Sequence, residues 1–391
     1  MSVRLDRPAL LLAVGLAGWS CAPFNLDIRS CPIRSLPDAS DKITVRYLGV
    51  GGFLISRGDP RLGRVVLTAP LYSNPSLVEL LGDHAVRPDT ELIDRLLPPE
   101  AGYARAILAG HSHYDHLMDV PYIALHKATA ANVYANTTAA HLLAPIAGAM
   151  RAKGTAVIPF IDSEIWDPAH TGVRKTIAPD VRVAAIRSEH SPQIALKTPF
   201  SKQLTPFLLW RGGTDEDRTE LPRSASEWAE GTVLAYVIDF MDGDHIAFRI
   251  YYQDSGTNEP IGFVPPGLKG RDCDLTIVCL GGNSKRLLNN PKGIIANTNP
   301  RYVILAHWED FFVTQDGYCR DGGHYGLEKE AGKPPYCSEG RIYALPSRWP
   351  LEETNVKAFR KDAAEAMTPG RVALKPLIPC PTRSVFEFDV P

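Results

Sequence analysis

The stretch Ala106-Ile-Leu-Ala-Gly-His-Ser-His-Tyr-Asp-His-Leu117 places three imidazoles and one carboxylate within six residues, at His111, His113, Asp115 and His116. An apolar run leads into this group, and a glycine interrupts the run just before the first histidine. The pattern predicts a buried strand that delivers a loop of ligands at its carboxyl end. Because alternate side chains of an extended segment face the same way, His111 and His113 can bind one ion together. Asp115 and His116, at the turn into a predicted helix, point towards a second ion. Imidazole and carboxylate are ligands typical of zinc.

The length and composition are those of a large globular protein. The chain has 391 residues, of which 45% are hydrophobic and 22% are charged, and its formal net charge is −2. This near-neutral balance gives no reason to expect a nucleic-acid partner. No apolar run reaches the roughly 18 residues that a membrane-spanning helix needs. We therefore expect one α/β domain over 42–391.

The amino terminus has the layout of an export signal. Arg4 and Arg7 precede an apolar segment over 9–18, and Cys21 follows it. This layout predicts a secretory signal peptide over 1–21, and the cysteine resembles the acylated cysteine of bacterial lipoproteins. Three alternatives stay open: a lipoprotein of the cell envelope or periplasm tethered to the membrane through Cys21, a soluble exported protein, and a cytosolic protein with an apolar start. The polar residues 22–41, rich in Pro and Ser, are predicted to form a linker.

The motif His-Ser-His-Tyr-Asp-His over 111–116 resembles the H-x-H-x-D-H signature of the metallo-β-lactamase superfamily. This resemblance implies an αββα sandwich, in which two mixed β-sheets are flanked by helices. It also implies three further metal ligands later in the chain. Predicted strands that begin at residues 181, 246 and 301 each end in a ligand-type residue. In chain order, these residues are His190, Asp254 and His307.

The resemblance also implies how the ligands are shared between two ions. The first ion takes His111, His113 and His190, the second takes Asp115, His116 and His307, and Asp254 bridges them. The expected cofactor is a pair of Zn²⁺ ions, with iron or manganese as open alternatives. Two such cations lower the pKa of a water between them, so a bridging hydroxide is the expected nucleophile. Asp115 and Asp254 are the expected catalytic residues, and Asp115 could pass a proton to the leaving group.

The expected activity is therefore metal-dependent hydrolysis. The form of the motif is most similar to the branch that includes N-acylphosphatidylethanolamine-hydrolysing phospholipase D and the ascorbate-phosphate lactonases. An exported protein would meet phospholipids, which favours a phosphodiesterase acting on a lipid-like substrate. A lactonase or other carboxylic-ester hydrolase with the same site is the first alternative. The second is a non-enzymatic envelope lipoprotein that keeps the fold for binding. The oligomeric state is left open.

Three features near the ligands depart from the signature or add to it. Ala69 stands where the superfamily has an acid near the metal site. Asp119 is one position later than the usual second acid, and it could orient a ligand histidine through a hydrogen bond. The irregular insertion 191–231, directly after His190, is either a substrate lid or a plain surface excursion.

Hydrophobic periodicity predicts most of the remaining elements. A hairpin is expected over 43–56, helices over 76–100, 117–127, 137–151, 290–297 and 351–367, and further strands over 64–70, 132–136, 232–240, 273–280 and 369–374. Cys273 and Cys279 are predicted to be buried free thiols. Cys319 and Cys337 flank a loop that a disulfide could close, within the C-terminal extension 316–391.

Overall fold

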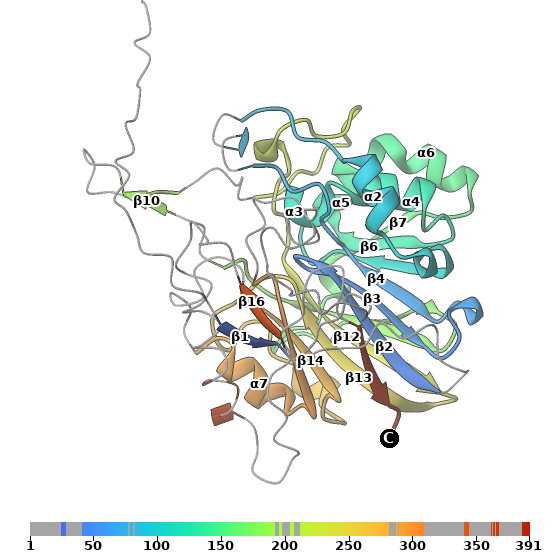
Figure 1. Ribbon diagram of the computed structural model, residues 1–391, viewed down its shortest axis with the longest axis vertical. Helices are drawn as coiled ribbons and strands as arrows, with labels where there is room; N and C mark the ends of the chain where they lie inside the picture. The colour runs from blue at the N-terminus through green and yellow to red at the C-terminus, as the bar shows by residue number, and fades with distance from the viewer. Residues whose placement is uncertain are drawn as a thin grey trace, which may run out of the picture.

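Two β-sheets pack face to face, with helices on both outer faces (Figure 1). The computed structural model describes residues 41–76, 79–80, 83–191, 212–280, 287, 289–308, 361, 363, 365–366 and 385–391, together with the strands 25–28, 195–197, 204–206 and 340–343. The predicted αββα sandwich with two mixed sheets is confirmed.

The first sheet has seven strands and carries the motif loop at the end of its fifth strand. Neighbouring strands are antiparallel up to the fourth and parallel from there on. In spatial order they are β17 (Val385–Asp389), β2 (Lys42–Gly49), β3 (Gly52–Arg57), β4 (Val65–Thr68), β5 (Ala106–Leu108), β6 (Asn132–Asn136) and β7 (Val157–Phe160).

The second sheet has six strands and supplies the later ligand-type residues. Its first three pairings are antiparallel and its last two are parallel. The strands, in spatial order, are β8 (Arg174–Ala178), β9 (Val181–Arg187), β12 (Leu234–Asp242), β13 (His245–Gln253), β14 (Leu275–Cys279) and β15 (Tyr302–Ala306). A tight turn joins β12 to β13, and Gly243 adopts φ 58° there.

Helices cover the outer face of each sheet. Side chains of α2 to α6 share an apolar cluster with the outer face of the first sheet, and α7 packs on the second. These helices are α2 (Thr90–Leu96), α3 (Tyr114–Leu117), α4 (Val120–His126), α5 (Thr137–Leu142), α6 (Ala144–Ala152) and α7 (Lys292–Thr298). Short 3₁₀ turns are η1 (Pro60–Leu62), η2 (Pro99–Tyr103), η3 (Asp162–Glu164), η4 (Ala225–Glu227) and η5 (Pro266–Leu268). No helix among the described residues is long and apolar enough to span a bilayer.

The main core lies between the sheets and follows from strand periodicity. Tyr236 and Ile238 of β12 point into the space between the sheets, whereas Ala235 and Val237 point outwards to the layer that contains α7. Because both faces of this strand are covered, its sequence is a continuous apolar run rather than an alternating one. Cys273 and Cys279 are buried free thiols, as predicted.

Several predicted helices are shorter than expected, and proline is one cause. Pro121 and Pro145 each occupy the first turn of a new helix, where the missing N–H costs nothing. The predicted helix 137–151 is therefore divided into α5 and α6, and the helix predicted over 117–127 begins only at Val120, after α3 has ended at Leu117. The helix predicted over 76–100 is wrong for 83–89, because Val86 donates its N–H to the Arg223 carbonyl instead (2.7 Å). The strands β7 and β8 were not predicted.

Other predictions fall on parts of the chain that the structure does not describe. The signal peptide 1–21 with Cys21, the disulfide between Cys319 and Cys337 and the strand over 369–374 lie outside the described residues, as does most of the predicted helix 351–367. Within 22–41, β1 (Asn25–Ile28) pairs with β16 (Gly340–Tyr343). Within the insertion, β10 (Ala195–Lys197) pairs with β11 (Leu204–Pro206).

Candidate metal centre

All seven side chains predicted as ligands meet at one end of the sandwich. Ligand-type atoms come within 4.8 Å of one another in three overlapping groups. Those groups are His111, His113 and His190; His111, His116 and Asp254; and Asp115, His116 and His307. The loops that carry them follow β5, β9, β13 and β15, so strands from both sheets position the site.

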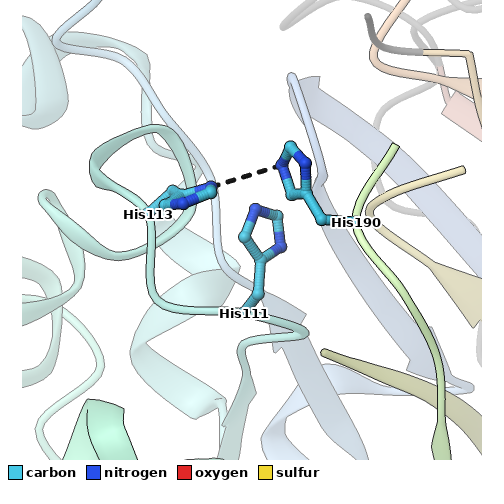
Figure 2. Close-up of side chains that lie close together, drawn as sticks. All are labelled: His111, His113 and His190. Carbon is cyan, nitrogen blue, oxygen red and sulfur yellow. Dashed lines mark hydrogen bonds between the residues drawn. The ribbon is translucent and has the colours of Figure 1, made fainter. Parts of the chain in front are cut away.

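The first group consists of three imidazoles that face a common space (Figure 2). His113 Nδ1 lies 3.2 Å from His190 Nε2. The ring of His111 is 4.8 Å from each of the other two rings, measured between centroids. A hydrogen bond fixes the His190 ring on the side away from the common space, where its Nδ1 is 2.7 Å from the Ser191 carbonyl oxygen. A carbonyl only accepts hydrogen bonds, so Nδ1 carries the proton and the Nε2 lone pair faces the common space.

The last group named above, called the second group from here on, pairs one carboxylate with two imidazoles. The middle group, which contains Asp254, overlaps both. Asp115 and His116 lie in the short helix α3, and His307 follows β15. Asp115 Oδ2 is 3.4 Å from His116 Nε2 and 3.4 Å from His307 Nε2. All three side chains are buried.

Asp254 lies between the two groups. Its Oδ1 is 3.1 Å from His111 Nδ1, and its Oδ2 is 3.4 Å from His116 Nδ1. The Gly110 N–H donates to Oδ2 at 2.8 Å and fixes the carboxylate. One carboxylate thus contacts an imidazole of each group, which is the placement that a bridging ligand requires.

Two glycines leave the room that this carboxylate needs. A Cβ on Gly110 would overlap the Asp254 carboxyl group. A Cβ on Gly51 would lie 2.9 Å from His116 Nδ1 and 3.0 Å from Asp254 Cβ. Since side chains at both positions would displace the ligand-type residues, glycine is required there for space rather than for its backbone freedom.

His307 is held in an uncommon backbone conformation. Its φ is 53°, in the left-handed region that non-glycine residues rarely occupy. Its N–H donates to the Val50 carbonyl at 2.9 Å, and Val50 itself has φ 53°. Tyr47 donates its hydroxyl to the same carbonyl at 3.0 Å. Such strain persists only where surrounding contacts enforce it, and it is concentrated at functional sites.

The pKa shifts of four ligand-type residues suit cation binding, whereas Asp115 and Asp254 raise the pKa of His116 despite its burial, so this imidazole has to release its proton to an ion. Burial lowers the pKa of His190 to about 3 and holds the pKa of His113 well below its usual value. Burial opposes ionisation of Asp115 and Asp254, but the neighbouring histidines keep the pKa of both carboxyls below the usual value. Neutral imidazoles and ionised carboxylates are the forms that bind metal ions.

Buried polar atoms without hydrogen bonds test whether ions fit here. Within the described part of the chain, His111 Nε2 and Asp115 Oδ1 have no hydrogen-bond partner. Leaving such atoms buried and unsatisfied is costly in free energy, about 1–3 kcal/mol each and more for a charged group. Coordination would satisfy both atoms. The residues therefore fit a pair of divalent cations.

The supporting residues differ in part from the prediction. Asp119 does not orient a histidine. Its Oδ2 accepts the backbone N–H groups of Tyr72 (2.7 Å) and Ser73 (3.0 Å), so it ties the chain after β4 to the start of α4. Ala69, at the position of the expected acid, is buried in the apolar cluster under the helices.

Ser255 is a supporting residue that the sequence did not indicate. Its hydroxyl oxygen accepts the Ser191 N–H at 2.9 Å. Because the Ser191 carbonyl binds His190, the loop that carries Asp254 also fixes His190. Neighbouring serines carry no sequence signal for this role, which depends on two loops meeting.

A cavity of about 690 Å³ opens beside the first group. Its lining includes His190 and three carboxylate side chains, Asp167, Glu189 and Glu230. Among the described residues of this lining, Arg187 is the one cationic side chain, and its Nε lies 3.9 Å from Asp167 Oδ2. The described part of the lining therefore carries more negative than positive charge.

Comparison with known proteins shows similarity to solved structures only. No family model matches the chain, and no curated protein matches it. A metallo hydrolase from the archaeon Ignicoccus hospitalis is 13% identical, with a TM-score of 0.44, over 89% of this chain and 98% of that one. Zn²⁺-bound PqqB from Methylobacterium extorquens is 12% identical, with a TM-score of 0.35, over 68% and 88%. A proposed zinc-dependent hydrolase of the metallo-β-lactamase superfamily from Thermotoga maritima is 11% identical, with a TM-score of 0.29, over 70% and 79%. At such values the function has to be argued from the site itself.

Proposed function

We propose that this chain is a metal-dependent hydrolase of the metallo-β-lactamase type that holds two divalent ions. The position of Asp254 between the two ligand groups carries the proposal. Two-ion hydrolytic sites hold their ions roughly 3.5–4 Å apart, a spacing that the two oxygens of one carboxylate can span. A single-ion site would have no use for the second group.

The ions and the two aspartates would have different roles in hydrolysis. Two Zn²⁺ ions, or iron or manganese in their place, would lower the pKa of a water and polarise the oxygen of a scissile carbonyl or phosphoryl group. Asp254 keeps the two ligand groups at a fixed separation. Asp115 contacts both histidines of the second group, and we assign it the transfer of a proton from the attacking water to the leaving group. The burial of these side chains keeps bulk water from the reacting atoms.

For the substrate, we propose a phosphodiester of the phospholipid type. Its support is the form of the 111–116 motif, together with the export layout of residues 1–21. An exported chain tethered through Cys21 would act at a membrane surface. Labelling of cells with a palmitate probe should mark the wild type but not a Cys21→Ala variant, and equal labelling of both would contradict the tether.

The cavity beside His190 favours the alternative substrate, a neutral lactone or carboxylic ester. Asp167, Glu189 and Glu230 would repel an anionic phosphodiester, and Arg187 is already near a carboxylate. A neutral ester would not meet this repulsion. The two substrate classes therefore make opposite demands on the same cavity.

Metal content and matched substrate panels test these proposals together. The Zn²⁺-loaded protein is incubated with N-acyl phospholipids and bis-nitrophenyl phosphate, and in parallel with a panel of lactones. Cleavage of the phosphodiesters alone supports the first substrate, and cleavage of the lactones alone overturns it in favour of the second. Asp254→Asn is the control that should abolish either activity. Fewer than about one ion per chain, with no hydrolysis, would instead support a non-enzymatic binding protein.

A further inference from the structure

We propose that Glu230 is a positioning residue for the first ligand group, in which its carboxylate holds His113 so that Nδ1 faces the ion. This inference rests on the proposed metal site but not on any hydrolytic activity. It also assigns a role to residues 212–231, the described end of the insertion. Through Glu230, this segment would support the metal site.

The two ring nitrogens of His113 face different partners. Nδ1 lies 3.2 Å from His190 Nε2, on the side of the common space. Nε2 lies 3.8 Å from Glu230 Oε2, on the opposite side. The His113 side chain is fully buried and that of Glu230 is 16% exposed. A carboxylate oxygen facing Nε2 favours a hydrogen on that nitrogen, which leaves the Nδ1 lone pair for the ion.

The backbone of Glu230 is fixed to the motif loop itself. Its carbonyl accepts the Ser112 N–H at 3.0 Å and an N–H of the Asn136 side chain at 3.2 Å. The same amide group of Asn136 donates to the Thr232 carbonyl at 2.8 Å, and its oxygen accepts the Ser112 hydroxyl at 2.8 Å. Glu230 is thus attached to the residue directly before His113 and cannot move independently of it.

Gly231 shows that this arrangement is built into the chain. Its φ is 66°, and a Cβ there would lie 2.6 Å from Asn136 Nδ2. Its N–H donates to the Gly212 carbonyl at 2.7 Å. The glycine lets the chain turn tightly against Asn136, and this turn directs the preceding Glu230 towards the ligand loop.

A carboxylate behind a ligand histidine fixes the ring orientation and makes the ligand a stronger donor. Loss of such a partner typically weakens metal binding by about 10–100-fold. The effect should fall on the first group, because the ligand histidine that lies next to the Glu230 carboxylate is His113. Binding of one ion should therefore weaken while the other is retained.

The test measures Zn²⁺ affinity in Glu230→Gln, Glu230→Asp and the matched control Glu227→Gln. Glu227 lies in the same segment and pairs with Arg218 at 2.6 Å, so the control removes an equal charge without touching a ligand. Competition with a chromophoric chelator should show one site weakened about 10–100-fold in Glu230→Gln. We expect partial recovery in Glu230→Asp and wild-type affinity in Glu227→Gln. Thermal unfolding of the metal-free proteins checks that each variant folds.

The wild type provides a second measurement that needs no variant. Nitrogen-15 NMR of the Zn²⁺-loaded protein should show His113 with a hydrogen on Nε2 and the ion on Nδ1. Wild-type affinity in Glu230→Gln, or a hydrogen on Nδ1 of His113, would overturn the inference. A chain that shows the Glu230 effect but hydrolyses no substrate would keep this inference and contradict the proposed function.

Discussion

Replacing Gly110 by alanine adds one methyl group directly against the Asp254 carboxylate. The new Cβ would lie well inside 3.0 Å of both carboxylate oxygens, closer than real contacts allow. The backbone cannot retreat easily, because the Gly110 carbonyl accepts the Leu234 N–H at 2.7 Å and its N–H binds Asp254 at 2.8 Å. The carboxylate must therefore rotate away from one of the two histidine groups.

The expected cost follows from the usual effect of overpacking, about 1–3 kcal/mol. If rotation of Asp254 relieves the clash, this energy appears as weaker metal binding, about 5–150-fold at 1.4 kcal/mol per factor of ten. Chelator competition measures the loss, and thermal unfolding of the metal-free protein separates it from a loss of folding stability.

Gly148→Ala is the matched control for this prediction. Gly148 lies in α6, and a Cβ there has no heavy atom within 4 Å. Alanine in a helix interior should stabilise the fold by about 0.5–1 kcal/mol and leave metal binding unchanged. If Gly110→Ala binds metal as tightly as the wild type and unfolds at the same temperature, the argument that space at residue 110 fixes the bridge is refuted.

Three other changes test separate parts of the structure. Asp254→Asn keeps the shape but removes the charge, so elemental analysis should show the content falling from two ions to one or fewer; two ions would contradict the bridge. Burial raises the pKa of Asp119 to about 6, above its value of 3.8 in an unfolded chain. The folded protein therefore binds this proton more tightly than the unfolded chain does, and the resulting stabilisation is present below pH 4 and is lost as the pH rises through 6. Metal-free Asp119→Asn should therefore lose less stability than the wild type between pH 4 and 7, by up to about 3 kcal/mol in chemical denaturation; parallel curves would contradict this. Arg249→Met strands the buried carboxylate of Asp239, which Arg249 binds at 2.7 and 2.8 Å, and should destabilise the fold by about 3–5 kcal/mol with metal content unchanged.

The local chemistry of the site could be predicted from the sequence. His111 and His113 are separated by one residue of an extended segment, and Asp115 and His116 follow at the next turn, so their spacing alone decides their directions. Strand periodicity then placed His190, Asp254 and His307 at strand ends. Those placements needed only the chain on either side of each residue, whereas the αββα fold class followed from the resemblance of the 111–116 motif to the metallo-β-lactamase superfamily.

Contacts between distant segments required the tertiary structure. The sequence does not show that Glu230 lies next to His113 Nε2, that Asp119 binds the backbone of Tyr72, or that β17 forms the edge of the first sheet beside β2. Each of these depends on the order of strands and on how loops from different strands pack. Nearby residues set which groups are available and how they are spaced. The folded sheets decide which side chains meet, because their contacts join residues that are tens to hundreds of positions apart in the sequence.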